Sequence, residues 1–587
     1  MIVPRLDWLL PEPILEPPVY AGFGAPVSTL LARRGLGDDA AVQRFLQAGI
    51  ATMHPVSLMA DADAALDRLE AAVAAGERIA IWGDYDADGM SAVSVWVLAL
   101  RALGVEPVRY VPSRWAEGYG LSQQGLETLA RDGVRLVVTC DCGVVNVAEV
   151  DVARTLGLDV VITDHHLPGP ILPRAVAVVD PHRLDCNYPD SDLTGAGLAY
   201  KLAAALLARR GTSTPDLAGV AAIGTVADLA PMTGESRAVV RLGLEELSTT
   251  RRAGLRALLS RATEHPDQVT AHDLAFGIAP RINAAGRIAE AELAMSLLVA
   301  EEAAEAERLA DELEAVGRRR RELTSVALAE ARNLLDGADD GDGPLVLRKD
   351  DWAPGLIGLV AGRLAEELGR PVAAVAAVGD ELRGSVRAPT DFHVAAALEA
   401  CATHLTKRGG HAGAGGFSLL PDTWEAFRTS FAGLARPYPV DAGTVVPPRG
   451  IVIDLVLPSR HLTWGLADEL ARLAPFGPGN AEPVLAVTGM HVTEARRVGA
   501  TEAHIAFRMR RGLEAFDAVA FGAPAERPLP DAGSAVDLVG TLERDTFQGI
   551  ERLRLRVIDY AESAASPLLA RRLAHAARVA PQLAAAS

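Results

Sequence analysis

Cysteine, lysine and long apolar runs are all scarce in this chain of 587 residues, and each scarcity excludes a class of protein. The four cysteines are too few for a disulfide scaffold. Apolar runs are broken by charge well before the roughly 18 residues of a membrane-spanning helix. The first residues, MIVPRLDWLLPEP, lack the basic start and apolar core of a signal peptide. We therefore expect a reduced, cytoplasmic protein that does not enter a membrane.

A surplus of positive charge is also absent, since 57 basic residues stand against 76 acidic ones and the formal net charge is −19. This balance disfavours nucleic-acid binding over the whole surface, but it leaves room for a basic groove on an acidic body. Only three of the basic residues are lysines, so arginine provides nearly all of the cationic side chains. With 49% apolar residues, the chain has ample material for buried cores.

Short β-branched runs alternate with Ala- and Leu-rich helical segments from about residue 55 to 240. The runs are ERIAIWGDYD, PVRYVPSR, VRLVVTCDCG, LDVVITDHH and AVAVVDPHR. This alternation predicts an α/β fold with a doubly wound parallel sheet. Each run ends near Asp, Cys, Arg or His, at the carboxyl edge where such sheets bind ligands.

A long charged segment without strand signals follows, then a second α/β pattern, and then short alternating strands typical of a small β-barrel. The predicted divisions are an N-terminal extension (1–54), a first α/β domain (55–288), a connecting helix (289–342), a second α/β domain (343–440), a barrel (446–560) and a C-terminal tail (561–587).

The stretch IWGDYDADGM places three carboxylates, Asp84, Asp86 and Asp88, two residues apart after an apolar run. Like charges this close raise each other's pKa unless a cation lies among them. The calcium-loop pattern fails, because its twelfth position is Val95 instead of Glu and the stretch follows a strand. A haloacid-dehalogenase-type nucleophile loop would need Thr or Val where Asp88 stands. A bound divalent cation is the simplest explanation of the crowding.

Similar side chains follow the neighbouring predicted strands. They are Asp141 in TCDCGV, Asp164, His165 and His166 in ITDHHLPG, and Asp228 in IGTVADLAPM. One such Asp is usually a helix cap or turn residue, but four clusters in sequence order predict a single site. Carboxylates with one or two imidazoles suit Mn²⁺ or Mg²⁺, and two such ions can activate water for attack on phosphorus. Cys140 and Cys142 lack a second cysteine pair, so we interpret them as buried strand-end residues, not zinc ligands.

These motifs are similar to those of the DHH phosphoesterase superfamily, named for the triplet Asp164-His165-His166. From about residue 50 to 560, further segments resemble the RecJ family within it: YVPSRWAEGYG, VVDPHRLDCNYP, LTGAGLAYKL, APRINAAGRI, DWAPGLIG, GSVRAP, GGHAGAGGFS and PFGPGNAEP. The resemblance implies a DHH domain, a DHHA1 domain and an OB-fold-like barrel. It also implies a single-stranded-DNA-specific 5′→3′ exonuclease of DNA repair and recombination, which releases 5′-mononucleotides by two-metal hydrolysis.

The resemblance implies roles for individual residues. The metal ligands would be Asp86, Asp88, Asp141, His165 and Asp228. Asp84 would be a ligand or a partner of one. Two further histidines would act on the reacting phosphate, namely His166 beside the metals and His411 from the GGHAGAGG loop of the DHHA1 domain. The contacts to the strand would come from Arg114 along its path and from a 5′-phosphate pocket of Arg281, Ser385 and Arg387.

Two positions depart from the family pattern. Ala353 and Pro354 follow Trp352 where the family has His, and Ala388 replaces the last Ser of GSxRS. Both changes leave the acidic clusters intact, so we expect activity to be retained. A local basic groove on the barrel is a further hypothesis, with the candidates Arg496, Arg497, Arg508, Arg510 and Arg511.

Two rival functions stay open. A nano-RNA or nucleotide phosphatase of the same superfamily would stop after two domains, so the extra barrel disfavours it. A non-catalytic single-strand-binding scaffold would tend to lose metal ligands, whereas this chain keeps them. By resemblance, the partners would be single-stranded DNA, a single-strand-binding protein and a RecQ-type helicase, and the chain would act as a monomer in the bacterial cytoplasm.

Overall fold

The computed structural model describes residues 2–12, 14, 18–113, 117–335, 343–435, 450–511, 514–547 and 550–563. The chain divides into two compact units. The larger comprises His54–Asp228 and Leu242–Pro448, and the smaller comprises Met1–Met53, Leu229–Arg241 and Arg449–Ser587. Among the described residues, no helix is both long and apolar enough to cross a membrane.

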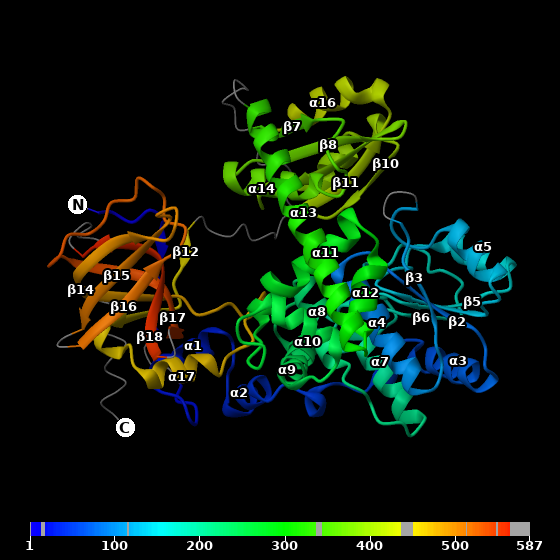
Figure 1. Ribbon diagram of the computed structural model, residues 1–587, viewed down its shortest axis with the longest axis horizontal. Coiled ribbons are helices and arrows are strands. Elements are labelled where there is room, and N and C mark those ends of the chain that lie inside the picture. Colours follow the sequence, from blue (N-terminus) through cyan, green and yellow to red (C-terminus); the bar gives the residue numbers. More distant parts are fainter. Residues whose placement is uncertain are drawn as a thin grey trace. The chain divides into compact units, whose positions relative to one another are not determined.

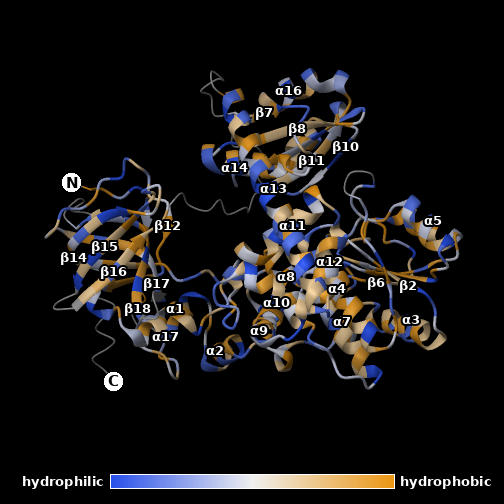
Figure 2. Ribbon diagram, viewed as in Figure 1, coloured by the Kyte–Doolittle hydropathy of each residue, from blue (hydrophilic) through white to orange (hydrophobic). Residues whose placement is uncertain are grey.

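The first α/β domain, in the larger unit, is built on a five-stranded sheet, of which Figure 1 labels β2, β3, β5 and β6. The strand order is β3-β2-β4-β5-β6, and every pair is parallel. Its strands are β2 (Ile79–Gly83), β3 (Val108–Tyr110), β4 (Leu136–Cys140), β5 (Asp159–Thr163) and β6 (Ala177–Val179). Helices cover both faces, so β2, β4 and β5 consist mostly of buried apolar residues. The hydropathy colours of Figure 2 show the apolar character of this sheet near the labels β2 and β6.

Helices α4 and α7 contact one face of this sheet, and α5 and α6 belong to the core on the other. The helices between residues 62 and 299 are α3 (Ala62–Ala75), α4 (Ala87–Ala102), α5 (Gln123–Arg131), α6 (Val147–Thr155), α7 (Gly195–Arg209), α8 (Ala218–Ala227), α9 (Gly234–Thr249), α10 (Ala253–Ala262), α11 (Ala279–Ile288) and α12 (Ala291–Val299). Of these, α9 begins in the smaller unit, which includes its residues up to Arg241, and ends in the larger one. A short π-helical segment, Asp273–Ile278, precedes α11. The predicted doubly wound parallel sheet is confirmed.

The predicted connecting helix is α13 (Ala303–Leu335), which starts later than the sequence pattern indicates. The preceding residues form the separate helix α12, which ends where Ala300 adopts an extended conformation and its carbonyl accepts a hydrogen bond from the N–H of Gly254. The first half of α13 packs against α10, α11 and α12, and Ala327 and Ala331 near its end pack into the core of the second α/β domain.

The second α/β domain has a mixed sheet in the order β10-β11-β9-β8-β7, in which only β7 and β8 are parallel. Its strands are β7 (Leu345–Arg348), β8 (Val372–Val378), β9 (Glu381–Arg387), β10 (Lys407–Gly410) and β11 (Ala414–Leu419). Helix α14 (Ile357–Leu368) packs on one face, and α15 (Val394–Ala400) and α16 (Trp424–Ala432) pack on the other.

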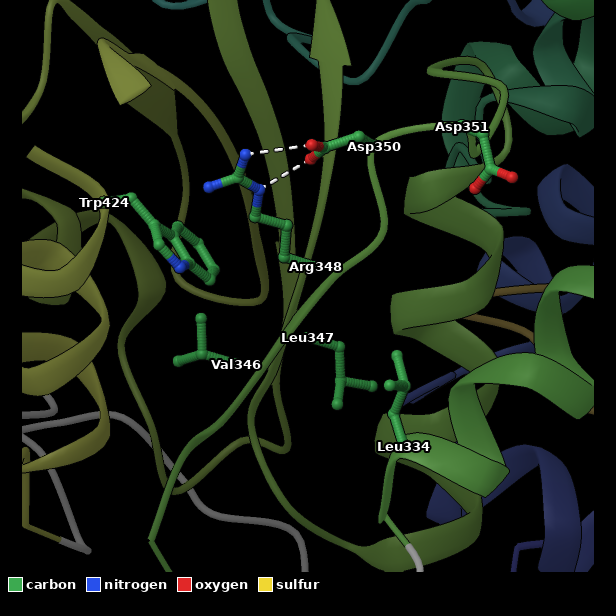
Figure 3. A pocket seen from close by; sticks show the side chains of 7 residues that line it. All are labelled: Leu334, Val346, Leu347, Arg348, Asp350, Asp351 and Trp424. Atoms are coloured by element: carbon green, nitrogen blue, oxygen red, sulfur yellow. Dashed lines mark hydrogen bonds and ion pairs between the residues drawn. The ribbon is translucent and has the colours of Figure 1, made fainter. Parts of the chain in front are cut away.

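A surface pocket beside β7 is lined by an ion pair and an aromatic ring (Figure 3). Arg348 forms a two-point ion pair with Asp350, with Nε to Oδ1 at 2.6 Å and Nη2 to Oδ2 at 3.0 Å, and its guanidinium lies 5.3 Å from the ring centre of Trp424. The remaining lining residues are Leu334, Val346, Leu347 and Asp351. None of the predicted site residues lines this pocket.

The smaller unit contains a closed barrel, because β14 pairs with both β15 and β17 and so completes the ring β14-β15-β16-β18-β17. The strands are β13 (Leu455–Pro458), β14 (Leu485–Val498), β15 (His504–Arg511), β16 (Glu514–Ala520), β17 (Ala535–Phe547) and β18 (Ile550–Glu562). The predicted small barrel is confirmed.

The N-terminal residues, predicted to be an extension, pack onto this barrel. Strand β1 (Trp8–Leu9) pairs with β12 (Ile451–Val452), and α1 (Ala25–Arg33), α2 (Asp39–Leu46) and α17 (Trp464–Ala471) share the barrel core. Arg237 adds another link within the unit, because its buried guanidinium donates to the carbonyls of Phe45, Ala474 and Pro475. Sequence patterns gave no sign of these associations, which join segments far apart along the chain.

Asp559 on β18 is the polar centre of this attachment. Its Oδ2 accepts hydrogen bonds from the N–H groups of Arg5 and Leu6, at 2.8 and 3.0 Å, and from the Trp8 indole at 3.0 Å. Its Oδ1 accepts from Arg527 at 2.9 Å. The side chains of Arg527 and Asp559 are both largely buried, so each charge offsets the unfavourable burial of the other.

We predict that Asp559→Ala lowers the free energy of unfolding of the smaller unit by about 3–5 kcal/mol, because it leaves Arg527 buried without its counter-charge and frees the segment around Trp8. Denaturant unfolding followed by tryptophan fluorescence measures the change. The matched control is Asp531→Ala in an exposed loop, which should stay within about 0.5 kcal/mol of the wild type. Equal effects of the two substitutions would contradict the prediction.

Candidate metal centre

Four carboxylates form one row along the carboxyl edge of the parallel sheet. In the registers of the paired strands, Gly83 lies opposite Cys140, Cys140 opposite Thr163, and Thr163 opposite Val179. The next residue on each strand is an aspartate, so the row consists of Asp84, Asp141, Asp164 and Asp180. All four side chains are buried. The side-chain chemistry of the site therefore begins at the same level on four adjacent strands.

The β2–α4 loop is shaped by backbone hydrogen bonds to its own carboxylates. Asp86 caps α4, since its Oδ1 accepts from the N–H groups of Asp88 and Gly89 at 2.9 and 3.0 Å. Asp88 reaches the first turn of α7, where Oδ2 accepts from Gly195 N–H at 2.7 Å and Oδ1 from Ala196 N–H at 3.1 Å. Helix N-termini favour negative charge, so both helices stabilise ionised carboxylates here.

Asp141 follows β4 in a left-handed backbone conformation, with φ of 63°. Such values are uncommon outside glycine and mark positions where the surrounding structure holds a side chain in place. Its Oδ1 lies 2.9 Å from Nε2 of His165, and the same imidazole nitrogen lies 3.8 Å from carboxylate oxygens of Asp88 and Asp228. His165 therefore stands among three carboxylates that come from different elements.

Asp164 orients the second histidine of the triplet. Its Oδ1 accepts from the backbone N–H of His165 and His166 and lies 2.8 Å from Nδ1 of His166, while Oδ2 accepts from Val144 N–H. The hydroxyl of Tyr119 donates to the carbonyl of Asp141 and lies 3.1 Å from the same His166 nitrogen. With Nδ1 engaged, Nε2 of His166 is the nitrogen available to a ligand.

Two glycines let α7 and α8 approach these carboxylates. A Cβ at Gly195 would lie 2.5 Å from Cβ of Asp141, and a Cβ at Gly224 would lie 2.5 Å from Oδ1 of Asp88. Such distances are too short for any side chain to occupy without movement of the acidic residues. Small residues at these positions are therefore part of the site, although neither coordinates anything.

The electrostatics of the cluster are those of crowded buried acids. Burial, and then the charges of neighbouring carboxylates, raise the pKa values of Asp88 and Asp141 well above the usual range, and burial raises the pKa of Asp228 to about 6. Burial also lowers the pKa of His165 to about 4, so that its imidazole is neutral near pH 7. For His166, burial lowers the pKa, but the hydrogen bond to Asp164 and the charges of Asp164, Asp228 and Asp84 together outweigh burial and raise the pKa to about 9.

The donor set fits hard divalent cations. Three groups of side chains each place one ligand atom per residue within 4.8 Å of the others: Asp84, Asp86 and Asp141; Asp88, His165 and Asp228; and Asp141, His165 and His166. Carboxylate oxygens with a neutral imidazole match the preferences of Mn²⁺ and Mg²⁺, and the cations would supply the positive charge that the crowded acids need. The six predicted ligands thus fall into groups that share this region. Asp228 reaches it from the end of α8, whose C-cap it is, and does not follow a strand as the sequence pattern predicts.

Cys140 and Cys142 are buried, as expected from their strand-end position, and Cys142 packs in the core between the sheet and α5 and α6. The predicted residues of the second α/β domain lie elsewhere in the larger unit. His411 is exposed between β10 and β11, and on β9 Arg387 donates to the Ser385 hydroxyl at 2.9 Å.

Arg281 lies on α11, where its guanidinium is held by three hydrogen bonds, to Glu314 and to the carbonyls of Gly277 and Arg261. Arg114 is outside the described residues. These two arginines were predicted to contact the strand, and their role stays a prediction.

The proposed basic set on the barrel does not form one exposed group. Arg497 donates to the carbonyls of Glu502, Pro524, Ala525 and Arg527, so it holds barrel loops together, and Arg496 pairs with Glu494. Arg508 and Arg510 are exposed on β15. The side chain of Arg511 lies outside the described residues.

Sequence reasoning missed Tyr119, Gly195, Gly224 and Asp180. The signal for Asp180 was present, because it ends a β-branched run just as Asp141 and Asp164 do. Tyr119 and the glycines carried no such signal, since their importance depends on which helices and loops meet at the sheet edge.

Comparison with known protein families identifies three domains, which follow one another in the order predicted from the sequence. Residues 78–225 match the N-terminal domain of the DHH family, residues 341–434 match the DHHA1 domain, and residues 453–559 match the RecJ OB domain. The cluster described above lies within the first match, except for Asp228 three residues beyond its end.

Comparisons over nearly the whole chain agree with these domain matches. The single-stranded-DNA-specific exonuclease RecJ of Bacillus subtilis is 34% identical over 92% of this chain and 68% of its own length, and that of Dickeya dadantii is 34% identical over 93% and 97%. Crystal structures of RecJ from Thermus thermophilus superpose with TM-scores of 0.80 for the Mn²⁺ complex and 0.74 for the Mg²⁺ complex, at 31% and 30% identity. These matches cover 96% of this chain and 80% and 79% of the Thermus chains. With three domain matches and this identity across nearly the whole length, the chain belongs to the RecJ family.

Proposed function

We propose that the protein is a metal-dependent exonuclease specific for single-stranded DNA, which removes 5′-mononucleotides in the 5′→3′ direction during DNA repair and recombination. The observation that carries this proposal is that six predicted carboxylate and imidazole ligands lie close together beside the carboxyl edge of the sheet, in a chain that also has an OB domain match. Barrels of this kind bind single strands through stacking and a local basic groove.

When bound, two Mn²⁺ or Mg²⁺ ions would activate water and neutralise charge on the scissile phosphate. Asp84, Asp86, Asp88, Asp141, His165 and Asp228 would hold them. His166, whose Nδ1 is engaged by Asp164, would present Nε2 to a phosphate oxygen and stabilise the charge that develops there. Tyr119 would keep that imidazole in place through its hydroxyl.

The second α/β domain would complete the site on the substrate side. We propose that His411 contacts the reacting phosphate and that Ser385 and Arg387, already hydrogen-bonded to each other, bind a 5′-terminal phosphate together with Arg281. Arg114 would line the path of the strand. Ala353 and Ala388 leave the metal-binding residues untouched, which supports retained activity.

The two rival functions find less support. A short-substrate phosphatase has no evident use for the closed barrel of the smaller unit. A non-catalytic scaffold has no need for the six predicted ligands, all of which lie close together here.

We also propose partners, a cellular compartment and domain boundaries. Family membership supports a single-strand-binding protein and a RecQ-type helicase as partners, action as a monomer, and the cytoplasm of a bacterium as the compartment. The proposed domain boundaries are 1–54, 55–288, 289–342, 343–440, 446–560 and 561–587.

The proposed reaction is tested with a long single-stranded DNA labelled at either end, incubated with Mn²⁺, Mg²⁺ or EDTA. We expect release of labelled mononucleotide from the 5′ end with metal and none with EDTA. Asp141→Ala should reduce the rate by more than about a hundredfold, because it removes a side chain that two of the three ligand groups share.

Three outcomes would contradict the proposal, each differently. Release from the 3′ end would overturn the polarity. Cleavage restricted to dinucleotides would favour the phosphatase, and binding without hydrolysis in any metal would favour the scaffold. Duplex DNA of the same sequence is the substrate control, and it should stay intact.

The close approach of α8 gives a second prediction. Gly224→Ala should lower kcat by roughly 10–100-fold at saturating metal, because its methyl group displaces Asp88 and misplacement by about 1 Å is costly in a catalytic site. Single-turnover rates with a 5′-labelled strand measure this loss. Gly37→Ala, an exposed position with open space around it, is the matched control and should cut at the wild-type rate. Normal turnover in Gly224→Ala would show that Asp88 tolerates displacement.

A further inference from the structure

The row of strand-end aspartates extends one strand beyond the cluster assigned to the metals. Asp180 follows edge strand β6 and lies opposite Asp164 in the parallel register, as shown by the pairing of Thr163 with Val179 and by the hydrogen bond from Asp164 N–H to the Val179 carbonyl. The side chain of Asp180 is completely buried. No role described above uses it.

Strands β5 and β6 end in the same local arrangement. In Asp164-His165-His166, Oδ1 of the aspartate accepts from the backbone N–H of the histidine two residues later and lies near its Nδ1. In Asp180-Pro181-His182, Oδ1 of Asp180 accepts from His182 N–H at 2.7 Å and lies 3.7 Å from its Nδ1. Two Asp-x-His units thus stand side by side on neighbouring strands.

The Asp180-Pro181-His182 arrangement contains polar atoms that can still form hydrogen bonds. Among the residues that the structure describes, neither Oδ2 of Asp180 nor Nδ1 of His182 has a hydrogen-bond partner. Arg183, the neighbouring cation, forms ion pairs with Asp61 and Asp185 at 2.6 and 2.7 Å. Burial raises the pKa of Asp180 to about 7, so a partner that carries a positive charge or donates a hydrogen bond is favourable there. The His182 side chain is 29% exposed and can supply this contact while reaching a ligand.

The spacing suits the substrate of the proposed function, on which this inference rests. Neighbouring strands lie about 4.8 Å apart, so the two units are one strand spacing from each other. A nucleic-acid strand whose scissile phosphate contacts His166 carries its next phosphate a short distance away. We propose that His182 binds a phosphate adjacent to the scissile one and that Asp180 is a positioning residue that orients the His182 imidazole.

The first test is His182→Asn, compared with the wild type on a long single strand with Mn²⁺. We expect kcat/KM to fall by roughly tenfold or more, the size of a hydrogen bond to a charged group, with the loss in KM and with kcat within about twofold. His182→Lys, which places an ammonium donor at this position, should restore part of the loss. His265→Asn, in an exposed loop, is the matched control and should behave as the wild type.

The adjacent phosphate has two possible sources, and substrate chemistry distinguishes them. One oligomer carries a 5′-hydroxyl instead of a 5′-phosphate, and another carries an uncharged methylphosphonate at the linkage that follows the scissile one. The substrate on which the wild type and His182→Asn become equal identifies the phosphate that His182 binds. A difference that persists at full size on both substrates would overturn the proposal.

Asp180→Asn tests the positioning role, because the amide oxygen can still accept from His182 N–H while the charge is lost. We expect a several-fold rise in KM in the wild-type background and none in the His182→Asn background. An equal rise in both backgrounds would show that Asp180 acts only on the fold. Should His182→Asn unfold below the assay temperature, His182→Gln replaces it in every comparison.

Failure of this inference is distinguishable from failure of the proposed function. If the wild type releases no nucleotide with any metal, the proposed function is wrong. If the wild type cuts and the His182 variants cut equally well, the proposed function stands and only the role of His182 is wrong.

Discussion

Repulsion among buried carboxylates at the carboxyl edge of one parallel sheet is the constraint on which this structure depends. Parallel strands in a common register end at the same level, so aspartates placed after each strand crowd together. The acids can stay ionised only with hydrogen-bond donors and cations close by. The helix caps, glycines and histidines around these acids place hydrogen-bond donors beside the carboxylates or allow helices to approach them.

Backbone N–H groups of the chain itself donate many of the hydrogen bonds that stabilise these carboxylates. Asp86 is held by the first turn of α4, Asp88 by the first turn of α7, and Asp164 by three N–H groups of the strand-end loops. For Asp86 and Asp88, these donors are backbone N–H groups, which hold the carboxylates without adding a positive side chain that would compete with a metal. The acidic loop is thus preorganised for cations, which is why close helix packing through Gly195 and Gly224 matters to its chemistry.

The sequence predicts the parts of this site that depend on the parallel strands and on the residues directly after them. A strand buried on both faces is a short β-branched run, and a ligand at its end is the next polar residue, so β2, β4 and β5 and their aspartates were visible. Contacts made across the fold had no such pattern. Tyr119 acts through the Asp141 carbonyl, Arg237 through three backbone carbonyls, and the first residues of the chain through Asp559 on β18. Each depends on tertiary neighbours that composition and periodicity do not specify.

The barrel shows why a net charge of −19 is compatible with a nucleic-acid substrate. Along β18, Arg552 pairs with Asp517 and Asp545, Arg554 with Glu543, and Arg556 with Glu482. Arginines neutralised in this way hold strands together and contribute little attraction for a phosphate backbone. Proteins that bind single strands combine a local basic groove with base stacking, so binding does not require the paired arginines of β18. A protein built in this way depends on local fit more than on total charge, which favours a narrow choice of substrate over indiscriminate binding.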